Sequence, residues 1–443
     1  MKYGKSLKCI LLIALNLLLV NSQFIDLIGS QTKTYYSKQN HSYNWIWNEY
    51  LDAPDSIFGS DIAHFGSSFG PFHNKTELYN KLYSIEENFP NIIEIKEIGR
   101  SYLNNSILVV IITNELSTKN KNEFFLVAHH HARELITLEN ALYFIDRLIF
   151  DYIEGDEEIE HILNSKRLHI VPSLNVDALD MLHLRSDQRK NLRPIDEDGD
   201  GTIDDTEMLT GVDSSDPDTT IGEDKPGGVD LNRNYPYEWG VQFGTDDPSN
   251  EIYRGKYPLS EPETYALASY VRSYNFKAAV TLHAGLATIF TPWFCDPEAE
   301  CPDHELYSEV GEELESLTGL DFVKLTYNLT GVWLDWMYGG RGIFAVNFET
   351  YRNSSSDNLW DWSNPPANEV MGNCENVVYP GLKYMIKFNP PELNILPTEN
   401  LTTIPTTEEV GNENIINFIV IIGFLILVKK KPSKLKYKSQ VMK

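Results

Sequence analysis

The sequence predicts an α/β fold, in which helices flank a mixed central sheet and the functional site lies at the carboxyl edge of the strands. Short segments rich in β-branched and aromatic residues alternate with longer amphipathic segments, which is the pattern of an α/β sheet. Two of the predicted strands run directly into histidines. Side chains in such positions gather in the crevice at one edge of an open α/β sheet.

The alternating pattern begins near Phe72. Strands are predicted where short apolar segments stand between turn residues, at 92–99, 106–113, 123–128, 167–173, 277–283 and 343–349. Helices are predicted where apolar residues recur every three or four positions, at 135–151, from Pro262 onward, at 303–317 and at 369–387. Pro262 follows Ser260 and Glu261, which is typical of a helix start. No internal repeat is visible.

The N-terminus has the composition of a targeting segment. In residues 1–22, three lysines precede an apolar run, which predicts a secretory signal peptide. A membrane-spanning helix is the alternative, but the run is short for one. Residues 23–70 are aromatic and polar without a clear period, so we expect an N-terminal extension ahead of a central domain at 71–389.

The C-terminus predicts attachment to a membrane. Residues 390–414 are rich in Thr, Pro and Asn, the composition of a linker. An apolar run at 415–428 precedes a basic tail at 429–443, which predicts a membrane anchor with a short cytoplasmic tail. The run is shorter than the ~20 residues of a full span, so a processed sorting signal is the alternative. We therefore expect an exported protein on the extracellular face of a membrane.

The net charge restricts the class of partner. Lys and Arg number 37 against 64 Asp and Glu, which gives a formal charge of -27. A chain this acidic is repelled by the phosphates of nucleic acid, so we expect no nucleic-acid partner.

Three cysteines follow the predicted signal peptide: Cys295, Cys301 and Cys374. An oxidising compartment would allow a disulfide, and the first two are only six residues apart. Since any two of the three can pair, the sequence does not assign the connectivity.

A candidate metal site begins where the strand at 123–128 runs into the sequence HHHARELI. His131 and Glu134 are three residues apart across a predicted strand-to-helix turn, so both can reach one ion. Ordinary helix capping also produces such pairs, so a third ligand is needed. His283 supplies it, because it closes another strand at the same sheet edge, and a catalytic zinc needs three protein ligands. The neighbouring histidines are interpreted as structural: His129, His130 and His169.

Around these residues the chain resembles the zinc carboxypeptidase family of the pancreatic carboxypeptidase A and B type. The resemblance covers about residues 72–388 and rests on eight stretches in family order: HARELI at 131–136, LNVDAL at 174–179, QRKNLRP at 188–194, GVDLNRNYP at 228–236, YRGKYPLSEPET at 253–264, TLHAG at 281–285, YNLTGVWLDWMY at 327–338 and AVNFE at 345–349. It implies a zinc carboxypeptidase-like fold, one zinc ion per chain, and removal of single residues from peptide C-termini.

The resemblance assigns two catalytic residues. Glu349, which closes the last predicted strand, corresponds to the general base. Zinc lowers the pKa of a bound water from about 15.7 to near 7, so a carboxylate beside it can take the proton. Arg189 corresponds to the cation that stabilises the negative charge of the tetrahedral intermediate.

The resemblance also assigns substrate-binding residues. Asn232 and Arg233 hold the free carboxylate of the peptide, for which a planar arginine fork is well suited. Tyr327 corresponds to a tyrosine that closes over the bound terminus, and Arg133 contacts residues further along the peptide.

Leu334 falls where the family sets its side-chain preference, which implies release of apolar residues. A shift of one residue in the alignment would put Asp335 there and imply a preference for basic residues. Ala284 and Gly285 differ from the pancreatic enzymes, so the dimensions of the pocket do not follow from the resemblance.

An acidic insertion at 196–207, DEDGDGTIDDTE, fits the twelve-residue calcium loop. Its candidate ligands are Asp196, Asp198, Asp200, Thr202, Asp204 and Glu207, with Gly201 at the turn position. An acidic surface loop is the alternative, and flanking helices are not evident. We predict one structural calcium ion.

The sequence thus favours a zinc metallocarboxypeptidase that acts on peptide or protein C-termini and releases apolar residues. An amidase of the same fold acting on cell-wall peptides is one alternative, although Asn232, Arg233 and Tyr327 favour the peptidase. A non-catalytic, calcium-dependent surface binding protein is the other, and the complete set of zinc ligands with Glu349 argues against it.

Overall fold

The computed structural model describes residues 72–182, 186–194, 228–241, 245–356 and 358–399. The signal peptide, the N-terminal extension, the calcium loop, the anchor and the basic tail lie outside these residues and stay predictions. Across the ranges that are described, no helix combines the length and the apolar character needed to cross a membrane.

Eight strands form one mixed sheet in the order β1-β2-β4-β3-β5-β8-β6-β7. Their bounds are β1 (Ile93–Arg100), β2 (Ser106–Ile112), β3 (Asn122–Val127), β4 (Lys166–Val171), β5 (Phe276–His283), β6 (Ala287–Phe290), β7 (Asp321–Phe322) and β8 (Phe344–Thr350). The central strands β4, β3, β5 and β8 are parallel, whereas β1 pairs antiparallel with β2, β2 with β4, and β6 with β8. The predicted mixed α/β sheet is therefore confirmed.

The helices are α3 (Lys75–Asn88), α4 (Leu135–Glu154), α5 (Glu157–Ser165), α6 (Pro262–Arg272), α7 (His304–Thr318), α8 (Trp333–Asp335), α9 (Leu359–Ser363), α10 (Ala367–Gly372) and α11 (Tyr379–Lys387). Short 3₁₀ turns occur at Ala178–Asp180 and Leu231–Arg233, and π-helical turns at Trp336–Gly340 and Asn373–Val378. Pro262 begins α6 as predicted, because its missing N–H and fixed φ suit the first turn of a helix.

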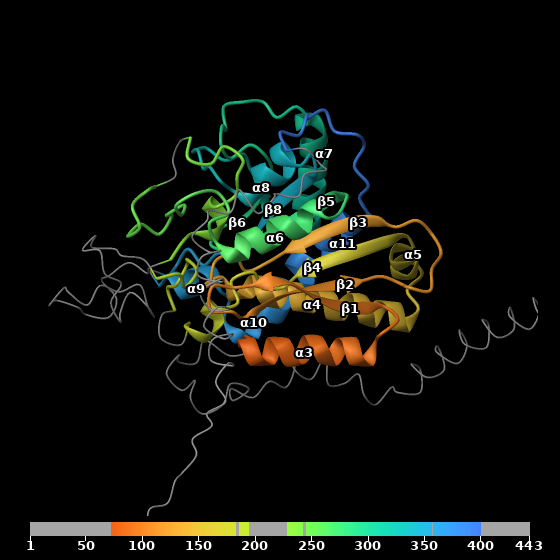
Figure 1. Ribbon diagram of the computed structural model, residues 1–443. Helices are drawn as coiled ribbons and strands as arrows, with labels where there is room; N and C mark the ends of the chain where they lie inside the picture. The colour runs from red at the N-terminus through yellow and green to blue at the C-terminus, as the bar shows by residue number, and fades with distance from the viewer. Residues whose placement is uncertain (1–71, 183–185, 195–227, 242–244, 357, 400–443) are drawn as a thin grey trace, which may run out of the picture. The chain divides into compact units, whose positions relative to one another are not determined.

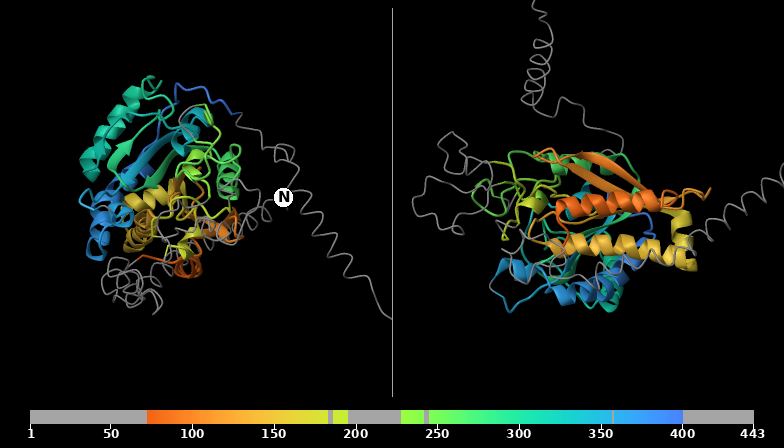
Figure 2. Two further views of the ribbon diagram at one scale, coloured as in Figure 1. Left: turned by 90° about the vertical axis from the view of Figure 1, so that its left-hand side faces the viewer. Right: turned by 90° about the horizontal axis from the view of Figure 1, so that it is seen from below.

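Helices cover both faces of the sheet (Figure 1). Alternate residues of each strand face opposite sides, so Phe124 and Leu126 pack in one apolar cluster and Phe125 and Val127 in the other. The first cluster includes residues of α3, α4, α5, α7 and α11, and the second includes α6 and α8. Figure 2 shows α3 and α4 side by side, joined by a buried ion pair of 2.9 Å between Lys81 and Asp146.

Residues 390–399, which we call the C-terminal strap, correct the predicted start of the linker. Glu399 accepts hydrogen bonds from Arg272 at 2.8 and 3.1 Å and from the indole nitrogen of Trp336 at 3.1 Å. Arg341 lies 3.5 Å from the same carboxylate. The folded domain thus extends through Glu399. The polar composition of the segment did not reveal this, because composition does not show that one of its carboxylates has buried cationic partners.

A buried histidine and three cysteines lie away from the metal cluster. His169 is fully buried and bonded to Glu123 at 2.7 Å and to the Tyr270 hydroxyl at 2.6 Å, as its strand position predicted. The three cysteines that follow the predicted signal peptide are free thiols in this structure: Cys295, Cys301 and Cys374.

A buried carboxyl lies in the first turn of α6. Burial, together with the charge of Glu261, raises the pKa of Glu263 to about 8. The Glu263 carboxyl accepts hydrogen bonds from the Tyr102 backbone N–H at 2.9 Å and from the Asn191 amide at 3.2 Å. These contacts hold the turn between β1 and β2 against the start of α6.

Glu263 should make the stability of the fold depend on pH. The folded carboxyl keeps its proton to about pH 8, whereas the ordinary pKa is 4.5, so the folded state binds more protons in this window. The contribution of Glu263 to folding stability is therefore complete below its ordinary pKa of 4.5 and is lost as the pH rises through about 8. Glu263→Gln, neutral at every pH, should flatten the fall in Tm over this range. The exposed Glu305→Gln serves as control, and an unchanged slope in Glu263→Gln would contradict the raised pKa.

Candidate active site

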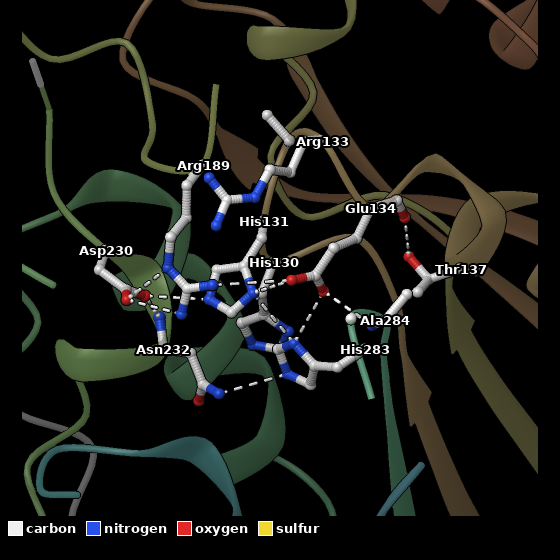
Figure 3. Close-up of polar contacts among 12 residues, drawn as sticks. His130, His131, Arg133, Glu134, Thr137, Arg189, Asp230, Asn232, His283 and Ala284 are labelled. Atoms are coloured by element: carbon white, nitrogen blue, oxygen red, sulfur yellow. Dashed lines mark hydrogen bonds and ion pairs between the residues drawn. The ribbon is translucent and has the colours of Figure 1, made fainter. Parts of the chain in front are cut away.

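Three side chains meet at the carboxyl edge of β3 and β5: His131, Glu134 and His283 (Figure 3). His131 and Glu134 lie between the end of β3 and the start of α4, and His283 is the last residue of β5. Because β3 and β5 are parallel neighbours, their carboxyl ends coincide. The structure thus brings together the three residues that the sequence proposed as ligands.

The geometry of this cluster fits zinc. One ligand atom from each residue lies within 4.8 Å of the others, and all three side chains are buried. The Nδ1 atoms of His131 and His283 are 3.2 Å apart. Two nitrogens held tetrahedrally at the usual Zn–N distance of 2.0–2.1 Å are about 3.3 Å apart. Two imidazoles and one carboxylate are a common donor set for catalytic zinc, and they leave a fourth position for water or substrate.

A buried aspartate orients the first histidine. Asp230 Oδ1 lies 3.1 Å from His131 Nε2, the nitrogen that points away from the cluster. Burial opposes ionisation of Asp230, but the charges of Arg189 and Arg233 hold its pKa well below its usual range. A carboxylate in this position fixes the proton on Nε2 and leaves Nδ1 free to bind a metal ion.

Asp230→Asn should weaken zinc binding by about 10- to 100-fold, the usual effect of losing such an outer carboxylate. A neutral amide no longer increases the basicity of His131. Zinc affinity of the variant, measured by competition with a chelator, tests this prediction. Tm recorded in parallel separates a specific loss of zinc affinity from a general loss of stability. Asp177→Asn is the control, because this buried aspartate bonds the turn between β1 and β2. Equal zinc affinities would contradict the orienting role.

Arg189 lies beside the same carboxylates. Its Nε and Nη2 donate to Asp230 Oδ2 at 3.1 and 3.0 Å, and its Nη1 is 3.6 Å from Glu134 Oε1. Figure 3 shows dashed contacts from Asp230 to both Arg189 and His131. The guanidinium is thus fixed next to the metal cluster.

Glu349 lies on β8, in register with His283 on β5. Burial and the nearby charge of Glu134 raise the pKa of Glu349 to about 7. A raised pKa makes the Glu349 carboxylate a stronger base, as proton abstraction requires.

One cavity of about 260 Å³ joins these groups. The predicted zinc-binding, catalytic and substrate-binding residues line it with one exception: His131, Arg133, Glu134, Arg189, Asn232, Arg233, His283, Tyr327 and Glu349. Tyr327 is 55% exposed and also lines a neighbouring cavity, so it lies at the rim. Arg133 is held by Glu251 at 3.0 Å.

Arg233 has a donor without a partner. Its Nη1 donates to the Asn232 carbonyl at 2.7 Å, but its buried Nε has no hydrogen-bond partner among the described residues. Asn232 is fixed by the Trp333 backbone N–H, which donates to its Oδ1 at 2.9 Å. A buried guanidinium with an unused donor, lining a cavity, is suited to binding an anion.

Leu334 is the exception, since it is not among the side chains that line the cavity. It is 2% exposed and packs in the same apolar cluster as the lining residues Phe290 and Phe294, so its effect on side-chain preference stays a prediction. Asp335 is fully buried and accepts backbone N–H bonds from Phe294 and Cys295. The Asp335 carboxylate is thus already bonded to backbone donors.

The sequence reasoning missed the apolar lining and one polar residue of the cavity. Phe290, Phe294, Leu325 and Leu329 line it in place of Leu334. Asn347 lines it as well, and its spacing from Glu349 was the available signal, since residues two apart in a strand share one face.

Comparison with known proteins finds carboxypeptidases. The chain is similar to carboxypeptidase A5 of Homo sapiens, with 25% identity over 296 residues that cover 64% of this chain and 60% of that protein. It is also similar to carboxypeptidase A1 of Bos taurus, with 24% identity over 292 residues, 64% of this chain and 63% of that protein. The chain thus spans about three fifths of the length of these relatives.

Solved structures show the same fold. The structure of thrombin activatable fibrinolysis inhibitor matches with a TM-score of 0.60 at 22% identity, over 75% of this chain and 78% of that one. Carboxypeptidase A from Helicoverpa armigera matches with a TM-score of 0.59 at 18% identity, over 79% and 80%. The family model described as zinc carboxypeptidase matches residues 78–400, well over half of the sequence. The chain belongs to the zinc carboxypeptidase family.

Proposed function

We propose that this protein is a zinc-dependent metallocarboxypeptidase that hydrolyses the C-terminal peptide bond of peptides. The observation that carries the proposal is the single cavity that joins three metal-binding side chains, a carboxyl with a pKa of about 7 and two arginines. Hydrolysis and recognition of a chain end both need these groups within reach of one substrate.

Recognition of the chain end is proposed for Arg233 and Asn232. The free Nε of Arg233 can donate to a carboxylate, and the Asn232 side chain lies beside it at the same cavity. A carboxylate there would give the buried guanidinium the partner that it lacks. Tyr327, exposed at the rim, is assigned the role of covering the bound terminus.

The proposed chemistry divides between the metal and the chain. Bound zinc polarises the scissile carbonyl and acidifies a water molecule. Glu349 takes a proton from the water and returns it to the leaving amine, two tasks that suit a pKa of about 7. Arg189 donates hydrogen bonds to the carbonyl oxygen as it becomes negative, and its pairing with Asp230 holds it ready.

The preference for apolar C-terminal residues is proposed from the cavity lining. Phe290, Phe294, Leu325 and Leu329 offer an apolar surface to a side chain that enters. Aliphatic and aromatic side chains gain most from burial against such a surface.

The test is release of free amino acids from peptides that end in Leu or Phe, by protein comprising residues 23–399. Release should stop when a chelator removes zinc, and peptides with an amidated C-terminus should not be cleaved. Equal cleavage of amidated or cell-wall peptides would favour the amidase, and zinc binding without any turnover would favour a binding protein.

Calcium binding at 196–207 and membrane attachment through 415–428 are separate proposals from the sequence. Loss of activity on removal of calcium, with zinc retained, would support a structural role for the calcium loop. Recovery of the full chain in the membrane fraction would support the anchor.

A further inference from the structure

One histidine of the sequence HHHARELI packs on a proposed zinc ligand although it does not reach the cavity. His130 is fully buried, and it is not among the side chains that line the cavity. Its ring stacks on the ring of His283, with 5.2 Å between the ring centroids and 23° between the planes (Figure 3). Aromatic rings pack favourably at centroid distances of about 4.5–7 Å. His130 therefore contacts a metal ligand without contacting substrate.

Hydrogen bonds and packing fix the ring of His130. Its Nε2 lies 2.9 Å from the Tyr235 hydroxyl, and its Nδ1 lies 3.4 Å from the hydroxyl of Thr281, two residues before His283 on β5. Tyr235 is itself fully buried, and its ring stacks on that of Trp336 at 5.3 Å, with 21° between the planes. The imidazole cannot turn without losing these contacts in the core, where an unmade hydrogen bond is costly. His130 thus presents one fixed, flat face to His283.

The two histidine ligands differ in what faces their outer nitrogens. Nε2 of His131 faces the carboxylate of Asp230, whereas Nε2 of His283 faces the side-chain amide of Asn232 at 3.3 Å. A neutral amide orients an imidazole less firmly than a carboxylate does. An imidazole binds a metal ion best when the ion lies in the ring plane, so a tilt of the ring weakens the bond. The ring of His130 opposes such a tilt, because it covers the face of His283 and not its edge.

We propose that His130 is a positioning residue that fixes the ring plane of His283 for zinc. His130 neither holds the metal nor touches the substrate, and it acts through the ring that it packs on His283. The inference rests on the zinc site of the proposed function, but it concerns the binding of the metal and not the cleavage of a peptide. Partners that orient a metal ligand from outside usually change metal affinity by about 10- to 100-fold.

The test uses the full-length protein with two changes at position 130, each made together with Tyr235→Phe. A change of His130 alone would leave the buried Tyr235 hydroxyl without its partner. His130→Met fills the space with a flexible side chain that has no flat face, so zinc affinity should fall by about tenfold. His130→Phe restores a flat ring and should bind zinc nearly as tightly as Tyr235→Phe alone. Competition with a chelator measures zinc affinity, and Tm of the metal-free protein records stability.

His169→Met is the matched control. His169 is also a fully buried histidine bonded to a tyrosine hydroxyl, that of Tyr270 at 2.6 Å. Its ring packs on Tyr270, Tyr274 and Phe276, none of which is a metal ligand. This variant should lower Tm and leave zinc affinity unchanged. A fall in zinc affinity that is confined to the His130→Met variant would thus report positioning and not a general loss of stability.

Two results would overturn the positioning role. One is a zinc affinity of the His130→Met variant equal to that of Tyr235→Phe alone, and the other is equal weakening by His130→Met and His130→Phe, since the flat ring would then have no effect. Failure of the proposed function gives a different result, because wild-type protein that binds zinc but cleaves no peptide would leave the order of these affinities intact. Absence of zinc binding by the wild-type protein would overturn both.

Discussion

Glu349→Gln is expected to lower kcat by about 10²- to 10⁴-fold, the usual contribution of a general base. Glutamine has the shape of the carboxyl but cannot take a proton. Glu349 is not one of the three clustered ligands, so zinc content should stay unchanged. In the wild-type protein the base must be ionised, so kcat/KM should fall at acidic pH as Glu349 takes up its proton.

The control for this variant is Glu123→Gln, at the amino end of β3 and therefore at the opposite edge of the sheet. Steady-state rates on a peptide ending in Leu, together with zinc analysis, decide the result. Activity of Glu349→Gln close to that of the control would remove Glu349 from the mechanism.

Arg189→Met is expected to lower kcat by about 10²- to 10³-fold, the effect of removing one donor to a developing oxyanion. The guanidinium is fixed by Asp230 and lies 3.6 Å from Glu134, so it contributes its charge without rearrangement. Because the oxyanion exists only in the transition state, KM should change little. Arg189→Lys should recover only part of the rate, since lysine cannot form the same two-pronged contact with Asp230.

Arg233→Met provides the contrast. This variant removes the proposed partner of the substrate carboxylate and should raise KM, because that contact is made in the bound substrate as well as in the transition state. Should Arg189→Met raise KM and leave kcat unchanged, Arg189 would belong to substrate binding instead.

The metal cluster could be predicted from sequence because its residues stand at strand ends. His131 and His283 directly follow or close apolar strands, and parallel strands bring their carboxyl ends to one edge whatever the details of packing. Asp230 could not be found in this way, because its importance depends on the histidine nitrogen that it faces, which is a property of the tertiary structure.

Leu334 belongs to a segment that the resemblance could locate, but its burial in the same apolar cluster as Phe290 and Phe294 depends on packing that the sequence does not give. The short strands β6 and β7 escaped prediction because four and two residues are too few to show an alternating pattern. Helix α3 was missed although Asn74 and Glu77 form a capping box at its start, a signal that the sequence contains.

The C-terminal strap determines how far the chain can be truncated before the domain loses stability. Arg341 is fully buried and Arg272 mostly so, and Glu399 is the carboxylate that both approach. Removing one partner of a buried ion pair costs about 3–5 kcal/mol, a large part of the 5–15 kcal/mol that stabilises a typical domain. Truncation after Glu399 should therefore leave the stability of the domain unchanged, whereas truncation before Glu399 should lower it by an amount of this order. One carboxylate thus decides how much of the C-terminal segment the folded domain needs.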